Sequence, residues 1–348
     1  MSINNLGISA KVLIATTLVS LALITLSTIY MLQNVSKISN ETKENRIVEM
    51  KYLLDESIKH KEDIGLTNAI TIANDIRLIN ALKTDNREEA LKILSKISNN
   101  FKAHTSYKNV KIHLHTKDIH SFLRAWNPKK FGDDLSSFRK TLVKVNRDKK
   151  AFTTFEAGRA GLVLRGIAPL MINNEYYGSI EFIQGLNSVA KSFDSKQKHF
   201  MLLMNQDLSS VTSLQSNLQE VGSYQLSQKF IHQDFFNKAS NIDFKQLLKT
   251  GSYQDNNYLY TYQEVIDFNG KSLGIFLLGE NVKHLSKAVK NSTSTIYKST
   301  IAMILLLLIL SVVIFIVINK LVLSEIKELQ HTIKYVVSPE KPTFTTVS

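Results

Sequence analysis

Four arginines near the middle of the chain, Arg124, Arg139, Arg159 and Arg165, have the chemistry to bind a small anion. A planar guanidinium offers a carboxylate two parallel donors, which the ammonium of lysine cannot do. Trp126 lies close to the first of them and can supply an apolar wall or a cation–π surface. We therefore expect a small-molecule site here, for a carboxylate or an amino acid.

Arg139 also has a structural interpretation. It follows the segment FGDDLSSF, in which Asp133 or Asp134 could pair with it and cap the next helix. Arg124 and Arg165 lie among apolar residues on expected strands, so for these two a ligand role and a structural role both stay open.

The partner of Arg165 depends on strand register. If Asn173 and Asn174 form a two-residue turn, Arg165 lies opposite Phe182, shares a face with Gln184, and is free for a ligand anion. A one-residue bulge would set it opposite Glu181, which would neutralise it or help it to grip an amino acid. Tyr177 and Glu181 complete the expected ligand-binding residues, with Arg124, Trp126, Arg139 and Arg165.

Three histidines raise the question of a metal. His113 and His115 share a strand face, and His120 follows nearby. Asp118 is their one acidic neighbour at short spacing. We interpret them as solvated polar residues and predict no metal site.

The sequence carries no pattern that predicts an enzyme. Gly158, Gly161 and Gly166 resemble a phosphate loop, but a strand follows them where such a loop needs a helix N-terminus, so we predict a turn. No G-x-S-x-G nucleophile context occurs. There is no cysteine, which excludes disulfides, thiol nucleophiles and cysteine-ligated metals. We expect no catalytic residue and no cofactor.

Composition predicts a folded protein. The 348 residues are 44% hydrophobic, enough for a core, and 43 basic against 30 acidic residues give a net charge of +13. Two uncharged runs, residues 12–32 and 301–319, are each long enough to span a bilayer as a helix. The topology that follows places both termini inside and residues 33–300 outside. Nucleic-acid binding is then excluded, because most of the excess positive charge lies in the outer segment.

Periodicity divides the outer segment into helices and strands. Apolar spacings of three and four predict a helix that continues outward from the first span, then helices over residues 68–81 and 90–101, and a last one over 284–299. Alternation predicts two successive β-rich groups. In the first group the expected strands cover residues 110–114, 151–155, 162–172 and 176–184. The second, weaker group begins at Phe200, with strands over 222–230, 257–266 and 271–278. Asn269-Gly270 predicts a type I′ turn between the last two.

The chain resembles the double Cache sensor family of bacterial transmembrane receptors. The resemblance is carried by SFLRAW, PKKFGDDLSSFRKTL, EAGRAGLVLRGIAPL, YYGSIEFIQGLNSVAKSF and YLYTYQEVIDFNGKSLGIFLLGE, and covers residues 34–295. It implies an α+β fold with two PAS-like antiparallel-sheet modules, the ligand in the membrane-distal one. It also implies a sensor in the bacterial inner membrane with a periplasmic domain, which we expect to be a homodimer.

The C-terminal segment LSEIKELQHTIKYV resembles the first helix of a HAMP linker, without the proline usual near its start. No signalling hairpin, kinase or cyclase motif follows, so we expect either a truncated chain or one that works through another protein. The leading function is a chemoreceptor-type sensor of a small solute. The alternatives are the sensor part of a histidine kinase or diguanylate cyclase, and a membrane scaffold that binds a periplasmic protein. The expected divisions are 1–11 (cytoplasmic), 12–32 (first span), 33–300 (sensor, with modules at about 64–193 and 194–282), 301–323 (second span) and 324–348 (HAMP-like tail).

Overall fold

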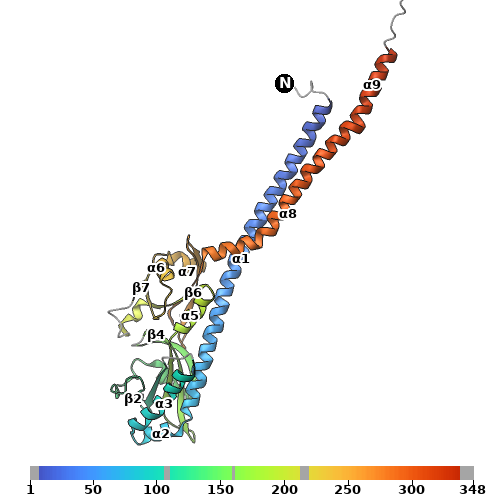
Figure 1. The fold of residues 1–348 in the computed structure, drawn as a ribbon. Helices are drawn as coiled ribbons and strands as arrows, with labels where there is room; N and C mark the ends of the chain where they lie inside the picture. The colour runs from blue at the N-terminus through green and yellow to red at the C-terminus, as the bar shows by residue number, and fades with distance from the viewer. Residues whose placement is uncertain (1–7, 106–109, 159–160, 212–218, 338–348) are drawn as a thin grey trace, which may run out of the picture. The chain divides into compact units, whose positions relative to one another are not determined.

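The computed structural model describes residues 8–105, 110–158, 161–211 and 219–337, which divide into two compact units (Figure 1). One unit comprises the described residues up to Glu44 and those from Ser286 onward. The other is Asn45–Leu285. The two units are described separately below.

The first unit consists of helices only. It contains the beginning of α1 (Ile8–Ala73), most of α8 (Val282–Val317), a π-helical segment (Ile318–Leu323) and α9 (Ser324–Val337). Helices α1 and α8 are both long and apolar enough to cross a membrane, and Leu18 and Leu306 are among their exposed apolar side chains. The hydroxyls of Ser20 and Ser311 lie 2.5 Å apart and join the two helices. Such all-round apolar exposure is what a helix pair in lipid requires.

The second unit begins with the rest of α1, followed by α2 (Ile76–Lys83) and α3 (Arg87–His104). The single helix expected over residues 68–81 is wrong, because α1 ends at Ala73 and α2 starts anew. The carboxylate of Asp75 accepts the backbone N–H of Arg77 and so caps the new helix.

The first sheet has five antiparallel strands in the order β2-β1-β5-β4-β3. Its two faces bury different kinds of residue. One face packs Leu114, Ala168 and Phe182 against the apolar sides of α1, α2 and α3. The other carries His113, Arg165 and Glu181 and is partly covered by α4 (Lys140–Asp148). The strands are β1 (Lys111–Thr116), β2 (Ser121–Arg124), β3 (Phe152–Gly158), β4 (Gly161–Ile172) and β5 (Glu175–Gln184).

The hairpin of β4 and β5 corrects the expected register. Asn173 and Asn174 both have positive φ and form the predicted two-residue turn. A bulge then follows on β5, between the pairs Met171–Tyr176 and Leu170–Gly178. The extra residue thus lies on the second strand, and Arg165 pairs with Ile183 instead of Phe182 or Glu181.

Glycine is required next to this bulge. Gly178 has a φ of 155°, and a Cβ there would meet the backbone carbonyl of His115 on the neighbouring strand. The close approach of β1 and β5 therefore requires glycine at this position.

The second sheet has six strands in the order β7-β8-β6-β11-β10-β9. Its core packs Phe235 of α6 and Leu247 of α7 against Tyr260 and Leu277. The expected strand over 222–230 is wrong, because only the three residues of β8 form a strand there. The elements are α5 (Asn187–Ser195), β6 (Lys198–Asn205), a 3₁₀ helix (Gln206–Val211), β7 (Glu220–Val221), β8 (Tyr224–Leu226), α6 (Gln233–Ala239), α7 (Phe244–Thr250), β9 (Ser252–Gln254), β10 (Tyr258–Ile266) and β11 (Ser272–Asn281).

The loop between β10 and β11 is not the expected type I′ turn. Gly270 has a φ of 81°, whereas Asn269 is not among the residues with positive φ. Asp267 holds the loop, since its carboxylate accepts the backbone N–H groups of Asn269 and Lys271.

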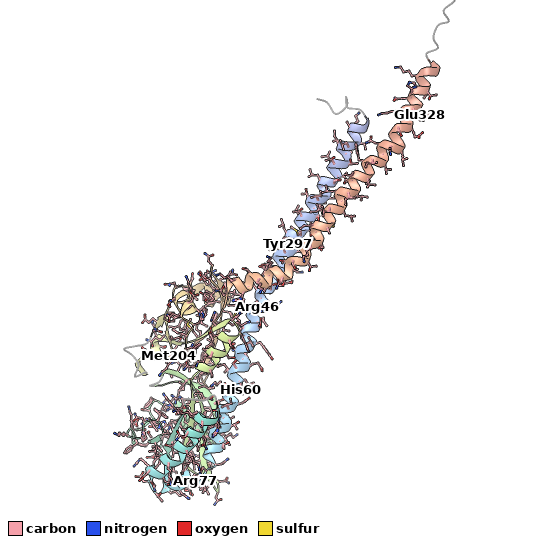
Figure 2. All side chains as sticks on the ribbon, in the orientation of Figure 1. Arg46, His60, Arg77, Met204, Tyr297 and Glu328 are labelled. Atoms are coloured by element: carbon pink, nitrogen blue, oxygen red, sulfur yellow. The ribbon has the colours of Figure 1, made fainter. Side chains whose placement is uncertain are left out.

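An ion-pair network fixes α1 to the second sheet. The guanidinium of Arg46, labelled in Figure 2, lies 2.5 Å from the buried carboxylate of Glu280 on β11. Glu49, one turn further along α1, accepts a hydrogen bond from the ammonium of Lys198 on β6 at 2.9 Å. The network attaches this helix to the two central strands of the sheet.

We expect residues 34–299, made alone, to fold as a soluble α/β domain, because both apolar runs lie outside this segment and both sheets lie inside it. A cooperative thermal transition of the purified fragment, followed by circular dichroism, would check this. Aggregation under all conditions without cooperative melting would contradict the boundaries.

Candidate functional site

A cavity of about 410 Å³ lies on the polar face of the first sheet. It is lined by Lys111, His113, Arg124, Trp126, Asn127, Lys130, Leu135, Phe138, Arg139, Gly158, Arg165, Ile183 and Lys229. The period of two along β1 and β5 places several of these side chains on one face. The volume suits a small organic molecule.

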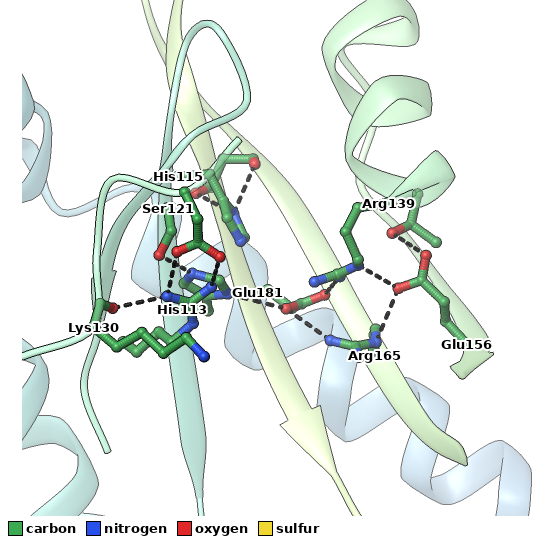
Figure 3. A network of polar contacts seen from close by, with 12 residues as sticks. His113, His115, Ser121, Lys130, Arg139, Glu156, Arg165 and Glu181 are labelled. Atoms are coloured by element: carbon green, nitrogen blue, oxygen red, sulfur yellow. Dashed lines mark hydrogen bonds and ion pairs between the residues drawn. The ribbon is translucent and has the colours of Figure 1, made fainter. Parts of the chain in front are cut away.

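Two lining residues, Arg139 and Arg165, are bound by two glutamates that do not themselves line the cavity, and Figure 3 shows Glu181 linked to both arginines. Arg165 lies 2.9 Å from Glu181 and 3.0 Å from Glu156. Arg139 donates to the same two carboxylates, to Glu156 at 2.7 Å. Thr141 donates a further hydrogen bond to Glu156 at 2.9 Å. Each arginine is therefore bound by both glutamates.

The network is buried, and its charges depend on one another. Glu181 is fully buried, and burial alone would raise its pKa. Arg139 and Arg165 outweigh burial and hold the pKa of Glu181 well below its ordinary value. Although Arg165 and Glu181 are not opposite in register, they share a face two residues apart and meet diagonally. The guanidinium of Arg165 is thus neutralised by a protein carboxylate, and it is not left free for a ligand anion.

Arg124 has its own carboxylate. Both of its Nη atoms donate to Asp133, at 2.7 and 2.8 Å, and one also donates to the carbonyl of Lys130. The expected pairing of Arg139 with Asp133 or Asp134 is wrong, because Asp133 is taken by Arg124. Asp134 instead accepts the backbone N–H of Ser136.

Trp126 and Lys111 lie side by side in the cavity wall. The ammonium of Lys111 lies 5.6 Å from the centroid of the Trp126 ring, and the ring of His113 meets the indole edge-on at 5.7 Å. Trp126 is 40% exposed, so it presents an open surface. Burial lowers the pKa of Lys111, and the positive charges of Lys229 and Arg165 lower it further.

The lining has a surplus of positive charge. Six of the described lining residues are lysine or arginine, and none is acidic. Asp133, Glu156 and Glu181 neutralise the three arginines, which leaves the charges of three lysines, Lys111, Lys130 and Lys229. An anion entering the cavity would offset the repulsion between these positive charges, which contributes to the lowered pKa of Lys111.

His113 and His115 are buried, so their expected solvated role is wrong. Side chains of neighbouring strands and loops, among them Glu181 and Trp126, surround the polar face of β1, which the alternation alone would leave to water. Nε2 of His113 lies 2.8 Å from the hydroxyl of Ser121, and Nδ1 of His115 lies 3.1 Å from that of Ser179. His120, by contrast, remains partly exposed beside Asp118.

These two histidines and Glu181 could in principle hold a metal, since their ligand atoms lie within 4.8 Å of one another. However, Glu181 is already paired with Arg139 and Arg165, and a cation would face both guanidiniums. The electrostatics of this cluster therefore disfavour a metal.

The buried histidines make the stability of the domain depend on pH. Burial lowers the pKa of His113 to about 4 and that of His115 well below 6.5. The unfolded chain takes up these protons near pH 6.5 and the folded domain does not, so stability is full above pH 6.5 and falls as the pH approaches 4. We expect each histidine to contribute a slope of about 1.4 kcal/mol per pH unit in this window. Urea denaturation at pH 7.5 and 5, followed by Trp126 fluorescence, measures it. His113→Asn should remove one such contribution, and an unchanged slope would contradict the account.

Of the six residues expected to bind a ligand, the structure brings Arg124, Trp126, Arg139 and Arg165 to the cavity. Glu181 lies behind the arginines. Tyr177 is elsewhere: its hydroxyl donates to Glu175 at 2.6 Å, and its ring lies under the ammonium of Lys83. Arg159 lies outside the described residues.

Sequence reasoning missed Lys111, Lys130, Lys229 and Glu156. One signal was present for Lys111, which shares a strand face with His113 at a spacing of two. No local pattern points to Lys229, which reaches the cavity from the segment between β8 and α6.

A family described as the double sensory domain of two-component sensor kinases matches residues 49–286. None of the curated proteins matches the chain.

Several solved structures are similar. The ligand-binding domain of the Campylobacter jejuni chemoreceptor Tlp3, solved with 4-methylisoleucine, is 12% identical, with 72% of this chain and 94% of that chain covered and a TM-score of 0.45. The sensor domain of the V. cholerae histidine kinase DctB is 11% identical, with 68% and 96% covered and a TM-score of 0.41. A domain of a sensory box/GGDEF family protein from Vibrio parahaemolyticus is 14% identical, with 72% and 99% covered and a TM-score of 0.42.

Proposed function

This chain belongs to the double Cache family of sensory domains, and from that premise we propose that it is a membrane-anchored receptor for a small anionic solute. The observation that carries the proposal is the cavity on the first sheet, whose described lining holds six basic side chains and no acidic one. A binding site of this sign and volume suits a small organic anion.

The paired arginines favour a carboxylate without an ammonium group over an amino acid. An amino acid needs an acidic partner for its ammonium, and Glu181 was the candidate. Both guanidiniums already bind Glu181, and it is fully buried behind them. Lys111 and Lys229 are the cations that we assign to the ligand anion, with the exposed Trp126 ring as the apolar wall.

The two apolar helices support a sensor that crosses the bacterial inner membrane. In the proposed topology residues 33–300 are periplasmic, with spans at 12–32 and 301–323. Helix α8 starts directly after β11, so a change in the second sheet is transmitted to the second span without a flexible linker. The proposed receptor is a chemoreceptor-type homodimer. A histidine kinase or cyclase sensor would use the same binding step.

A thermal-shift screen of the full chain in nanodiscs tests the proposal. The panel contains small mono- and dicarboxylates, the corresponding amides, and amino acids. A carboxylate at about 100 times its Kd should raise the melting temperature by about 5–10 °C, because it binds only the folded state. Stabilisation by amides to the same extent, or by no anion of the panel, would overturn the proposal.

A further inference from the structure

A second cluster of ligand-type side chains lies away from the cavity, where α5, β6 and the start of α6 meet. Asp194, His199 and His232 each offer one atom, and the three atoms lie within 4.8 Å of one another. Oδ1 of Asp194 and Nδ1 of His199 are 3.1 Å apart. Two ligands of one tetrahedral zinc ion, each bound at about 2.0–2.1 Å, are separated by about 3.3 Å.

The histidine rings are held in place by packing. The ring of His199 is buried and lies against His232 at a centroid distance of 4.1 Å. Phe235 stacks on it at 5.2 Å, and Tyr258 meets it edge-on at 5.4 Å. Because both aromatic residues are buried in the core of the second sheet, the His199 ring has a fixed orientation.

The charge around this cluster suits a cation. The hydroxyl of Tyr258 donates to Asp234, which lies two residues after His232 in the chain. Asp194 lies 3.1 Å from His199, and Asp234 also acts electrostatically on this ring, so two carboxylates supply negative charge to the cluster. The cluster of His113, His115 and Glu181 differs, because the guanidiniums of Arg139 and Arg165 already neutralise the charge of its carboxylate.

We propose that Asp194, His199 and His232 bind a divalent transition-metal ion of the zinc type, with the fourth position left to water or another ligand. Two imidazoles and one carboxylate are ligands that zinc accepts, whereas calcium and magnesium prefer all-oxygen sites. The ion would tie α5, which follows the first sheet, to β6, which pairs with β11 ahead of α8. The site is independent of the anion cavity and needs no assumption about its ligand.

His232 has a second role that guides the choice of variants. Its Nδ1 accepts the backbone N–H of Phe235 at 3.3 Å and so caps α6. A neutral imidazole has one lone pair, so a metal bound by His232 would take the place of this hydrogen bond. Asparagine is a good N-cap residue, so His232→Asn removes the imidazole and keeps the helix start. Asp194→Asn likewise keeps an oxygen beside His199 while it removes the negative charge.

The chain offers a matched control. Nδ1 of His120 also lies 3.1 Å from a carboxylate oxygen, that of Asp118, but no third ligand joins this pair among the described residues. His120→Asn should therefore leave metal binding unchanged.

The experiment is a Zn²⁺ titration of the full chain in nanodiscs, without a histidine tag and stripped with EDTA, in competition with a chromogenic chelator. We expect one saturable equivalent per chain, no binding of Mg²⁺, and a higher melting temperature with Zn²⁺. His232→Asn and Asp194→Asn should each weaken binding by at least about 100-fold, given the 10–100-fold effect of residues that only support ligands. Their melting temperatures without metal should stay near that of the wild type. Absence of a saturable equivalent, or binding that both variants retain, would overturn the site, as would an equal loss in His120→Asn.

Discussion

Replacing Glu181 by glutamine should lower the free energy of unfolding by about 3–5 kcal/mol, although the side chain keeps its shape. Glu181 is fully buried and compensates Arg139 and Arg165, whose side chains are each only 6% exposed. Without its charge, Glu156 alone would face two buried guanidiniums. Urea denaturation followed by the fluorescence of Trp126, the one tryptophan of the chain, measures the loss.

Two further variants make this prediction specific. Arg165→Ala should also destabilise the ligand-free domain strongly, and the double variant should lose less than the sum of the two, because the interaction is already broken. Arg77, labelled in Figure 2, forms an exposed pair with Asp75, and Arg77→Ala should leave stability near the wild type. A Glu181→Gln variant as stable as the wild type would show that the network does not hold the sheet.

Replacing Lys111 by methionine should have the opposite profile, with loss of ligand affinity and no loss of stability. Burial and the charges of Lys229 and Arg165 lower the pKa of Lys111, so its charge is unfavourable in the empty cavity. Methionine removes this repulsion and keeps a long apolar side chain beside Trp126. Affinity for the anion found by screening should fall by at least about 2 kcal/mol, or about 30-fold.

Calorimetric titration of the wild type and of Lys111→Met in nanodiscs measures the change in affinity. Their melting temperatures without ligand measure the change in stability. Lys117, which is exposed and directly follows the last residue of β1, is the matched control, and Lys117→Met should bind as the wild type does. Unchanged affinity in Lys111→Met would remove the lysine from the site. A large drop in its ligand-free melting temperature would make its role structural.

The sequence predicts much of the fold because its signals are local. Positive φ at Asn173 and Asn174 makes a tight turn, and the apolar runs of α1 and α8 determine helix type regardless of context. The register of β4 and β5, by contrast, does not follow from local signals. It depends on the bulge next to Gly178, where the backbone of His115 on another strand leaves no room for a Cβ.

The site was predictable in its residue types more than in its pairings. Arginine and tryptophan in one block pointed to the cavity that Arg124, Trp126 and Arg165 line. Which carboxylate each arginine meets depends on contacts that are distant in sequence, such as Arg139 with Glu181. Burial of His113 also follows from contacts with other segments, such as Trp126 and Glu181, that alternation along β1 cannot reveal.

The central claim, that the cavity binds an anion by its charge, is tested most directly by titrating the full chain with an acid and its amide. Trp126 lies in the cavity wall and is the chain's one tryptophan, so its fluorescence reports occupancy. The predicted result is a saturable change with a small carboxylate and no response at the same concentrations of its amide. Equal responses to acid and amide, or a response to the amide alone, would contradict the claim.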